Sequence, residues 1–138
     1  MSGSQATQFG SQIEAMQPRQ VGAVALFHPI LEALELPQVV RELVPSAADI
    51  DMGRIVALLV LNRLLAPQPL YRVNAWLART VLPEVLEMPI DKVYDNRLGR
   101  ALDRLHPYWG EVWARVVMRA IEVYALDLSV LHWDITSL

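Results

Sequence analysis

Apolar residues recur at every third or fourth position along most of this 138-residue chain, and prolines interrupt the pattern at intervals. Apolar residues with this spacing lie on one side of an α-helix. Proline fits the first turn of a helix but breaks its interior, so prolines divide such a pattern into separate helices. The sequence therefore predicts an all-α fold, a bundle of five to six helices.

The expected helices follow from where this spacing begins and ends. The first run contains Pro29, so its helix should start near that residue or break there. Asp49 or Asp51 is expected to cap the helix at 52–65, because a carboxylate can accept hydrogen bonds from the free amides of a first turn. The expected ranges are 21–36, 37–43, 52–65, 70–79, a short helix or turn between Pro83 and Pro89, 93–105 and 108–125.

Two helices should carry most of the core. The helix at 52–65 is apolar on almost every side, which is typical of a central helix surrounded by others. The helix at 108–125 is the most clearly amphipathic, and its Trp109 and Trp113 should join Trp76 in the core. Glu111 and Arg115 are spaced to form an i, i+4 ion pair on its outer face, worth roughly 0.3–0.5 kcal/mol.

The two ends of the chain differ from the helical part. Residues 1–18 are rich in Ser, Gln and Gly, which favours a disordered leader. Residues 129–138 carry β-branched and aromatic side chains without a strand breaker, and they predict one β-strand. A lone strand cannot pair its own backbone groups. We therefore expect a helical domain at 19–128, followed by the first strand of a catalytic domain that the chain does not contain.

The composition excludes several kinds of site. The chain has no cysteine, so it has no disulfide framework and no thiolate metal site. His28, His106 and His132 lie far apart, and none is at a metal-ligand spacing. The N-terminus lacks the features of a signal peptide, and the longest apolar run, 55–66, is too short to span a bilayer. We therefore expect a cytoplasmic protein without a membrane partner.

The net charge of −3 hides an uneven distribution. Residues 1–51 carry two arginines against six acids, whereas residues 52–120 carry ten bases against six acids, and no acid occurs from 52 to 83. A nucleic-acid surface needs local positive potential and does not need a basic whole chain. The distribution permits DNA binding, and an ordinary solvated surface is equally compatible with it.

One candidate DNA contact is a row of arginines. Arg97, Arg100 and Arg104 fall at i, i+3 and i+7 within one narrow arc of a helix, an arrangement that suits DNA phosphates. The alternative is a solvated face that is partly neutralised by Asp103 or paired with the acidic first third of the chain.

A second candidate is a helix-turn-helix at residues 52–79. Its second helix would present Tyr71, Arg72, Ala75 and Arg79 to a major groove. The connection, Pro-Gln-Pro, lacks the glycine usually found in such a turn. The alternative is plain helix packing with exposed arginines.

Three stretches resemble DDE transposases of bacterial insertion sequences. The His-x-Asp-x-Thr-Ser motif at 132–137 is similar to their first catalytic strand, apart from Ile135. The run at 94–105 is similar to an Asp-Asp-Arg-x-Gly-Arg-x-Leu-Asp-x-Leu run in the helical N-terminal domain of one branch, from which Asn96 departs. The third stretch is Pro-Leu-Tyr-Arg at 69–72, followed by Trp76. Together the three stretches cover roughly residues 20–138.

The resemblance implies that Asp134 is the first of three metal-binding acids in a ribonuclease-H-like domain. Such a site would hold Mg²⁺ or Mn²⁺ only in a full-length enzyme, because one carboxylate cannot hold the metal pair of phosphoryl transfer. A chain truncated after this strand should therefore bind no cofactor and should not be catalytic alone.

The role implied for such a truncated chain is binding of double-stranded DNA at the ends of the element, and assembly for transposition. The residues that we expect to contact DNA are Arg72, Arg79, Arg97, Arg100 and Arg104. The alternative is a helical dimerisation or interaction module, or a transposition inhibitor, without DNA affinity of its own. Its partner would be a second copy or a full-length transposase. A free-standing nuclease and a helical transcription regulator are more distant alternatives.

Overall fold

The computed structural model describes residues 18–46 and 51–129. These residues form seven α-helices and two short 3₁₀ helices, and they contain no β-strand. The all-α prediction is therefore confirmed for the described part of the chain. The elements are α2 (Pro18–Ala33), α3 (Leu36–Leu43), α4 (Met52–Leu65), α5 (Leu70–Leu77), α6 (Leu82–Val85), η1 (Ile90–Lys92), α7 (Asp95–Leu105), η2 (His106–Tyr108) and α8 (Trp109–Tyr124).

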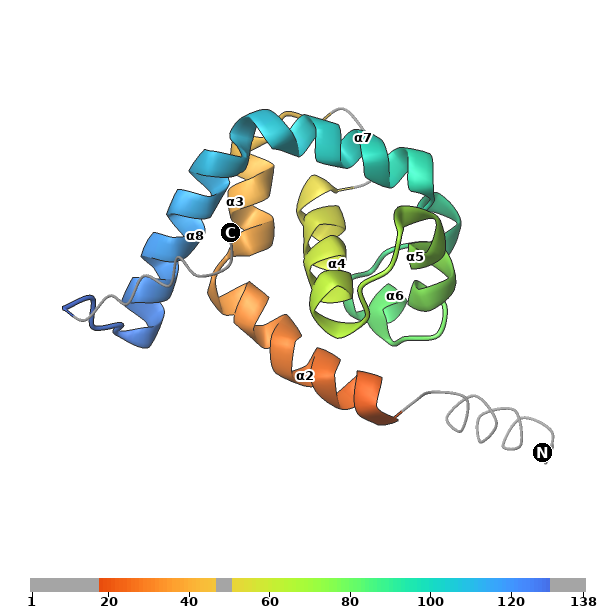
Figure 1. The fold of residues 1–138 in the computed structure, drawn as a ribbon, viewed down its shortest axis with the longest axis horizontal. Helices are drawn as coiled ribbons and strands as arrows, with labels where there is room; N and C mark the ends of the chain where they lie inside the picture. Colours follow the sequence, from red (N-terminus) through yellow and green to blue (C-terminus); the bar gives the residue numbers. More distant parts are fainter. Residues whose placement is uncertain (1–17, 47–50, 130–138) are drawn as a thin grey trace, which may run out of the picture.

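Helix α4 lies at the centre, as its almost uniformly apolar sequence predicts. It packs against α2, α3 and α7, and Figure 1 shows these three helices arranged around it. Asp51 begins the helix, since its Oδ1 accepts hydrogen bonds from the backbone N–H groups of Gly53 (2.8 Å) and Arg54 (3.3 Å). This cap satisfies two of the four free amides of the first turn.

The contact between α3 and α4 depends on a glycine. A Cβ atom at Gly53 would overlap the carbonyl oxygen of Pro37 and would lie only 2.9 Å from its carbonyl carbon. A backbone atom cannot turn away as a flexible side chain can. Glycine at this position therefore allows the two helices to approach each other closely.

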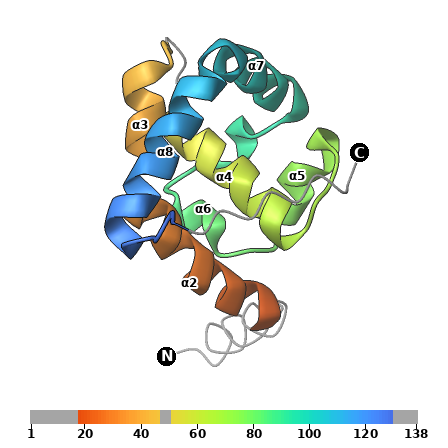
Figure 2. The same ribbon diagram turned by 60° about the vertical axis from the view of Figure 1, so that its left-hand side comes forward.

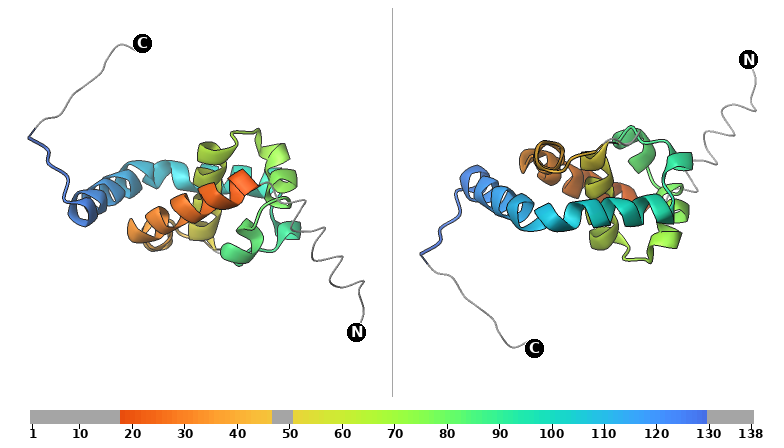
Figure 3. Two further views of the ribbon diagram at one scale, coloured as in Figure 1. Left: turned by 90° about the horizontal axis from the view of Figure 1, so that it is seen from below. Right: turned by 90° about the horizontal axis from the view of Figure 1, so that it is seen from above.

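Helices α7 and α8 form one bent rod along an edge of the molecule. The 3₁₀ turn η2 joins them, and α8 continues past the body of the fold to its end (Figure 3). Apart from η2, the main packing partner of α8 in the described chain is α3. The two helices lie side by side in both Figure 1 and Figure 2. Most of the circumference of α8 is therefore not covered by another described helix.

Three details differ from the sequence-based expectations. Helix α2 passes through Pro29 and ends only at Ala33. The ring of Pro29 is exposed, and a proline so near the end removes a single intrahelical hydrogen bond. Trp76 is buried at 2% exposure, as predicted, but Trp109 and Trp113 are 45% and 58% exposed.

The third difference concerns Arg115. It pairs with Glu42 of α3 at 2.6 Å instead of with Glu111 of its own helix. The helix turns its charged side, which we expected to face solvent, toward α3. The strand expected at 129–138 falls on residues 130–138, which lie outside the described residues, and it stays a prediction.

Within the described residues no single helix is long and apolar enough to cross a membrane. Only a bent pair, Val21–Ala33 with Leu36–Leu43, reaches that length and composition together.

Candidate nucleic-acid interface

Helix α5 exposes the side that the sequence predicts. Tyr71, Arg72, Ala75 and Arg79 are exposed, whereas Val73, Trp76 and Leu77 are buried beneath them. The helix is also held from the side, because Asn74 Nδ2 donates hydrogen bonds to the backbone oxygens of Ile90 (2.8 Å) and Val93 (2.6 Å). These bonds join α5 to the segment that leads into α7.

Arg72 of α5 and Arg79, two residues past its end, differ in how firmly they are held. The guanidinium of Arg72 lies 5.5 Å from the ring centre of Tyr71, within cation–π distance. Arg79 donates from Nε to the backbone oxygen of Ala75, in the last turn of α5, at 3.2 Å. Neither side chain forms an ion pair with a described carboxylate. Both therefore keep free N–H donors at the surface.

The arginine row on α7 is present, but its three members are not equivalent. Arg100 and Arg104 are exposed, and Leu98, Ala101 and Leu105 on the other side of the helix are buried.

Arg97 is less exposed than Arg100 and Arg104. It is half-buried, with its guanidinium 5.3 Å from the ring centre of Tyr94. Its Nη1 atom is enclosed and has no hydrogen-bond partner among the described residues. Arg100 and Arg104 are therefore the better placed of the three to meet a ligand.

The ion pairs of the described residues all fall elsewhere. Four arginines bind carboxylates through their guanidinium nitrogens. These pairs are Arg41 with Asp51 (2.6 Å), Arg54 with Glu87 (3.0 Å), Arg115 with Glu42 (2.6 Å) and Arg119 with Glu35 (3.3 Å). In the acidic first third of the chain, Asp51 thus pairs with Arg41 of α3, and Glu42 and Glu35 pair with the arginines of α8.

This distribution bears on one of the alternatives that the sequence leaves open, the neutralisation of the arginine row by acids. No described carboxylate, Asp103 included, lies within ion-pair distance of the arginines of α5 and α7. Unpaired cations on a surface raise the local positive potential, even in a chain that is acidic overall. The structure also brings the two arginine-bearing helices together, because the main packing partner of α5 is α7.

Arg63 is a further unpaired arginine that the sequence analysis did not single out. It is exposed in the last turn of α4, beside a groove of about 340 Å³. The groove is otherwise mainly apolar and is lined from α4, α7 and Trp109. The signal was present in the sequence, since Arg63 lies in the acid-free stretch from 52 to 83.

The candidate catalytic and metal-binding residue, Asp134, lies outside the described residues together with His132. In the described ranges, no three His, Cys, Asp or Glu side chains gather closely enough to hold a metal ion. Near the end of these ranges the pKa of Asp127 is lowered, because the backbone N–H and the side chain of Ser129 donate hydrogen bonds to its carboxylate. This carboxylate remains ionised well below neutral pH and takes no part in the arginine surface.

A family model described as "Domain of unknown function (DUF4277)" matches residues 16–116. The chain belongs to the DUF4277 family. The match covers α2 to α7 and the first half of α8, and it therefore includes every arginine of the candidate interface. No curated protein and no solved structure matches the DUF4277 chain.

Proposed function

We propose that this DUF4277 chain is the DNA-binding and assembly region of a DDE transposase. The observation that carries the DNA-binding part is the set of unpaired arginines at α5 and α7, two helices that pack together. By contrast, Arg41, Arg54, Arg115 and Arg119 each pair with a carboxylate. Paired charges are neutralised within the fold, whereas unpaired ones can release the counterions of DNA phosphates.

The two helices would contact DNA in different ways. Arg100 and Arg104 are exposed one turn apart on α7 and face no described carboxylate, which suits the phosphate backbone. Helix α5 has Tyr71 and the small Ala75 beside its arginines, which suits entry into a major groove. Because α5 packs mainly on α7 rather than on α4, the proposed DNA-binding unit is α5 with α7, in place of the helix-turn-helix of α4 and α5 expected at 52–79.

The transposase part of the proposal is supported by the resemblances at 69–76, 94–105 and 132–137. Asp134 would then be the first metal-binding acid of a full-length enzyme that uses Mg²⁺ or Mn²⁺. The 138 residues alone are proposed not to cut DNA, since two-metal phosphoryl transfer needs several converging carboxylates. The location that goes with this role is the cytoplasm.

A second candidate function is an interaction module without its own DNA affinity. The exposed aromatic side chains of α8, Trp109 and Trp113, favour it, because large exposed apolar patches mark sites of protein contact. The two candidates differ in whether the purified chain binds DNA.

The test compares a duplex carrying the element's terminal repeat with a random duplex of equal length. We expect the wild type to bind both and to prefer the repeat. Replacing Arg72 and Arg79 by Gln should remove the preference, at roughly 1–3 kcal/mol per lost base contact, and leave binding to the random duplex. The absence of wild-type binding to either duplex at low salt would contradict the proposal and favour the interaction module.

A further inference from the structure

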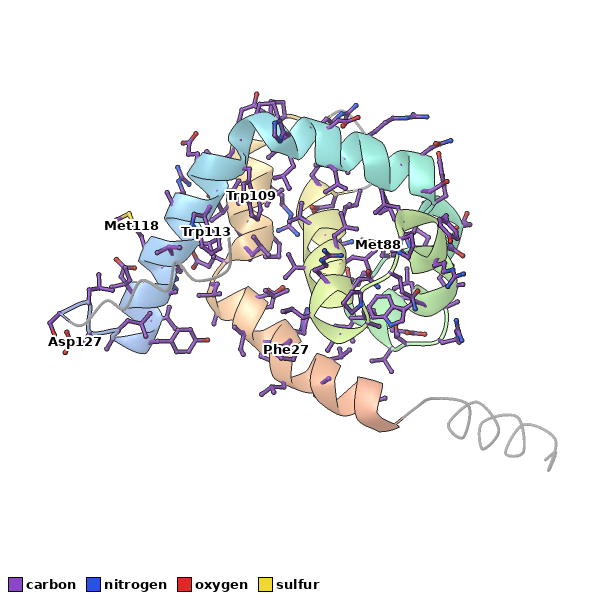
Figure 4. All side chains as sticks on the ribbon, in the orientation of Figure 1. Phe27, Met88, Trp109, Trp113, Met118 and Asp127 are labelled. Carbon is purple, nitrogen blue, oxygen red and sulfur yellow. The ribbon has the colours of Figure 1, made fainter. Side chains whose placement is uncertain are left out.

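Helix α8 carries an apolar stripe that no described helix covers. The stripe consists of Trp109, Trp113, Val117, Ala120 and Tyr124. At 100° per residue these five positions fall within an arc of about 80°. The two tryptophan rings stack on each other with their centres 6.3 Å apart, and Figure 4 shows both on one side of the helix, with Met118 on the other.

The charges of α8 lie on another side. Glu111, Arg115, Arg119 and Glu122 fall in a second arc, and the two arginines of this arc bind Glu42 and Glu35. The ion pairs fix the orientation of α8 on α3 and leave the stripe turned away from them. A partner for the stripe must therefore be apolar and free of charge, because a charge buried against it would remain unpaired.

The stripe is complementary to itself in the antiparallel direction. The midpoint of α8 lies between Val116 and Val117. Trp109 and Tyr124 are equally far from this midpoint, and so are Trp113 and Ala120. Two copies of α8 placed antiparallel about this midpoint would thus bring their Val117 side chains close to a two-fold axis. They would also set each Trp113 opposite a small Ala120, which leaves room for the ring. An isologous contact requires this kind of self-complementary patch.

Apolar surface beyond the two ends of the stripe is also complementary in the antiparallel arrangement. Trp109 lines the groove between α4 and α7, together with Leu102 and Leu105. In the antiparallel arrangement, this groove meets the residues that follow α8 in the other copy, where Leu126 and Leu128 are 49% and 53% exposed. The apolar surface beyond each end of α8 would therefore also be covered.

The exposed area is sufficient for a modest dimer. With about 150–250 Å² for each aromatic side chain, the exposed fractions of Trp109, Trp113 and Tyr124 amount to roughly 300 Å² per copy. Two copies would bury about twice that area from these rings alone. The remaining stripe residues and the groove bring the total toward the roughly 1,200 Å² of a small specific interface. An interface of this size implies weak association.

From these observations we infer that the chain forms a homodimer through an antiparallel pair of α8 helices, with Val117 of each copy near the two-fold axis. The inference deepens the assembly part of the proposed function and rests on it in that respect. It needs no DNA, so its test is separate from the test of DNA binding.

The experiment uses the full 138-residue chain and begins with sedimentation equilibrium up to hundreds of micromolar. We expect a monomer–dimer equilibrium, weakened about tenfold or more by Trp113→Glu, because aromatic side chains dominate such interfaces. The matched control is Met118→Glu, since Met118 is 67% exposed on the opposite side of the same helix. This control should dimerise like the wild type.

A cross-link tests the orientation independently. Because the chain has no cysteine, a single introduced thiol reports one contact alone. Under mild oxidation Val117→Cys should give a disulfide-linked dimer, whereas Met118→Cys should form no disulfide between copies, because disulfides need Cα atoms about 4.4–6.8 Å apart.

Three outcomes would overturn the inference. They are a wild type that remains monomeric over the whole range, a Trp113→Glu variant that still dimerises, and equal cross-linking of the two cysteine variants. A monomer whose tryptophan emission is that of buried rings would show that another part of the same chain covers the stripe.

Discussion

At the scale of single residues, Gly53 sets how closely α3 and α4 can pack. A methyl group at this position would meet the backbone of Pro37. We expect Gly53→Ala to lower the free energy of unfolding by roughly 1–3 kcal/mol, the usual cost of overpacking. The control is Gly22→Ala in α2, where nothing lies within 4 Å of the new methyl group. It should be neutral or should stabilise by up to about 1 kcal/mol through helix propensity. Urea denaturation measures both, and equal effects would contradict the close approach.

The backbone of Ala125, at the end of α8, is also important at this scale, because it is strained. It ends α8 with φ 48° and ψ 48°, a left-handed conformation that costs most residues roughly 1–2 kcal/mol and suits glycine. Ala125→Gly should therefore raise the free energy of unfolding by about 0.5–1 kcal/mol. The same substitution at Ala114, inside the same helix, should lower it by about 1 kcal/mol. Thermal melts of the two variants should shift in opposite directions, and a shift of both to lower temperature would refute the account of the helix end.

At the scale of elements, Arg119 joins α8 to the corner between α2 and α3. It donates from Nε to the backbone oxygen of Ala33 at 3.3 Å and pairs with Glu35 at 3.3 Å. Ala33 ends α2, so its carbonyl is one of those without an intrahelical partner. We expect Arg119→Gln to cost roughly 1–2 kcal/mol. Arg115→Gln, which breaks only the exposed pair with Glu42, should cost about 0–1 kcal/mol. If Arg119→Gln and Arg115→Gln lower the denaturant midpoint by the same amount, the hydrogen bond to Ala33 contributes nothing to stability.

The same helix shows where sequence reasoning reached its limit. The bounds of α4 could be predicted because this helix is apolar on the sides that its neighbours cover. The burial of Trp76 could be predicted because this residue lies on the apolar side of α5. Helix α8 is apolar over more of its circumference than one neighbour can cover, so spacing alone could not tell which side is buried. Its orientation depends on Glu35 and Glu42 of another segment, and that pairing is not visible in the sequence of α8.

For the candidate site, too, part of the arrangement could be predicted from the sequence and part could not. The spacing of residues along α5 and α7 was enough to predict which arginines face outward. It could not show that Arg97 lies half-buried against Tyr94 while Arg100 and Arg104 are exposed. Nor could composition show which arginines are neutralised, because Glu42 and Glu35, which pair with Arg115 and Arg119, are more than 70 positions away in the sequence.

At the scale of the whole molecule, the fold separates paired from unpaired charge. Asp51, Glu42 and Glu35 of the first third pair with arginines of α3 and α8. The arginines at α5 and α7 face no described carboxylate. A chain with a net charge of −3 can thus present a locally basic surface to DNA.

The most direct measurement of this claim is the salt dependence of DNA binding. The affinity for a random duplex is followed over a salt series for the wild type, for Arg100/Arg104→Gln and for Arg115/Arg119→Gln. Each variant loses two positive charges, but only the first pair is unpaired in the fold. We predict that the slope of log affinity against log salt falls by roughly two for Arg100/Arg104→Gln, at about 0.9 per phosphate contact. It should stay unchanged for Arg115/Arg119→Gln. Equal slopes for the two variants would contradict the account.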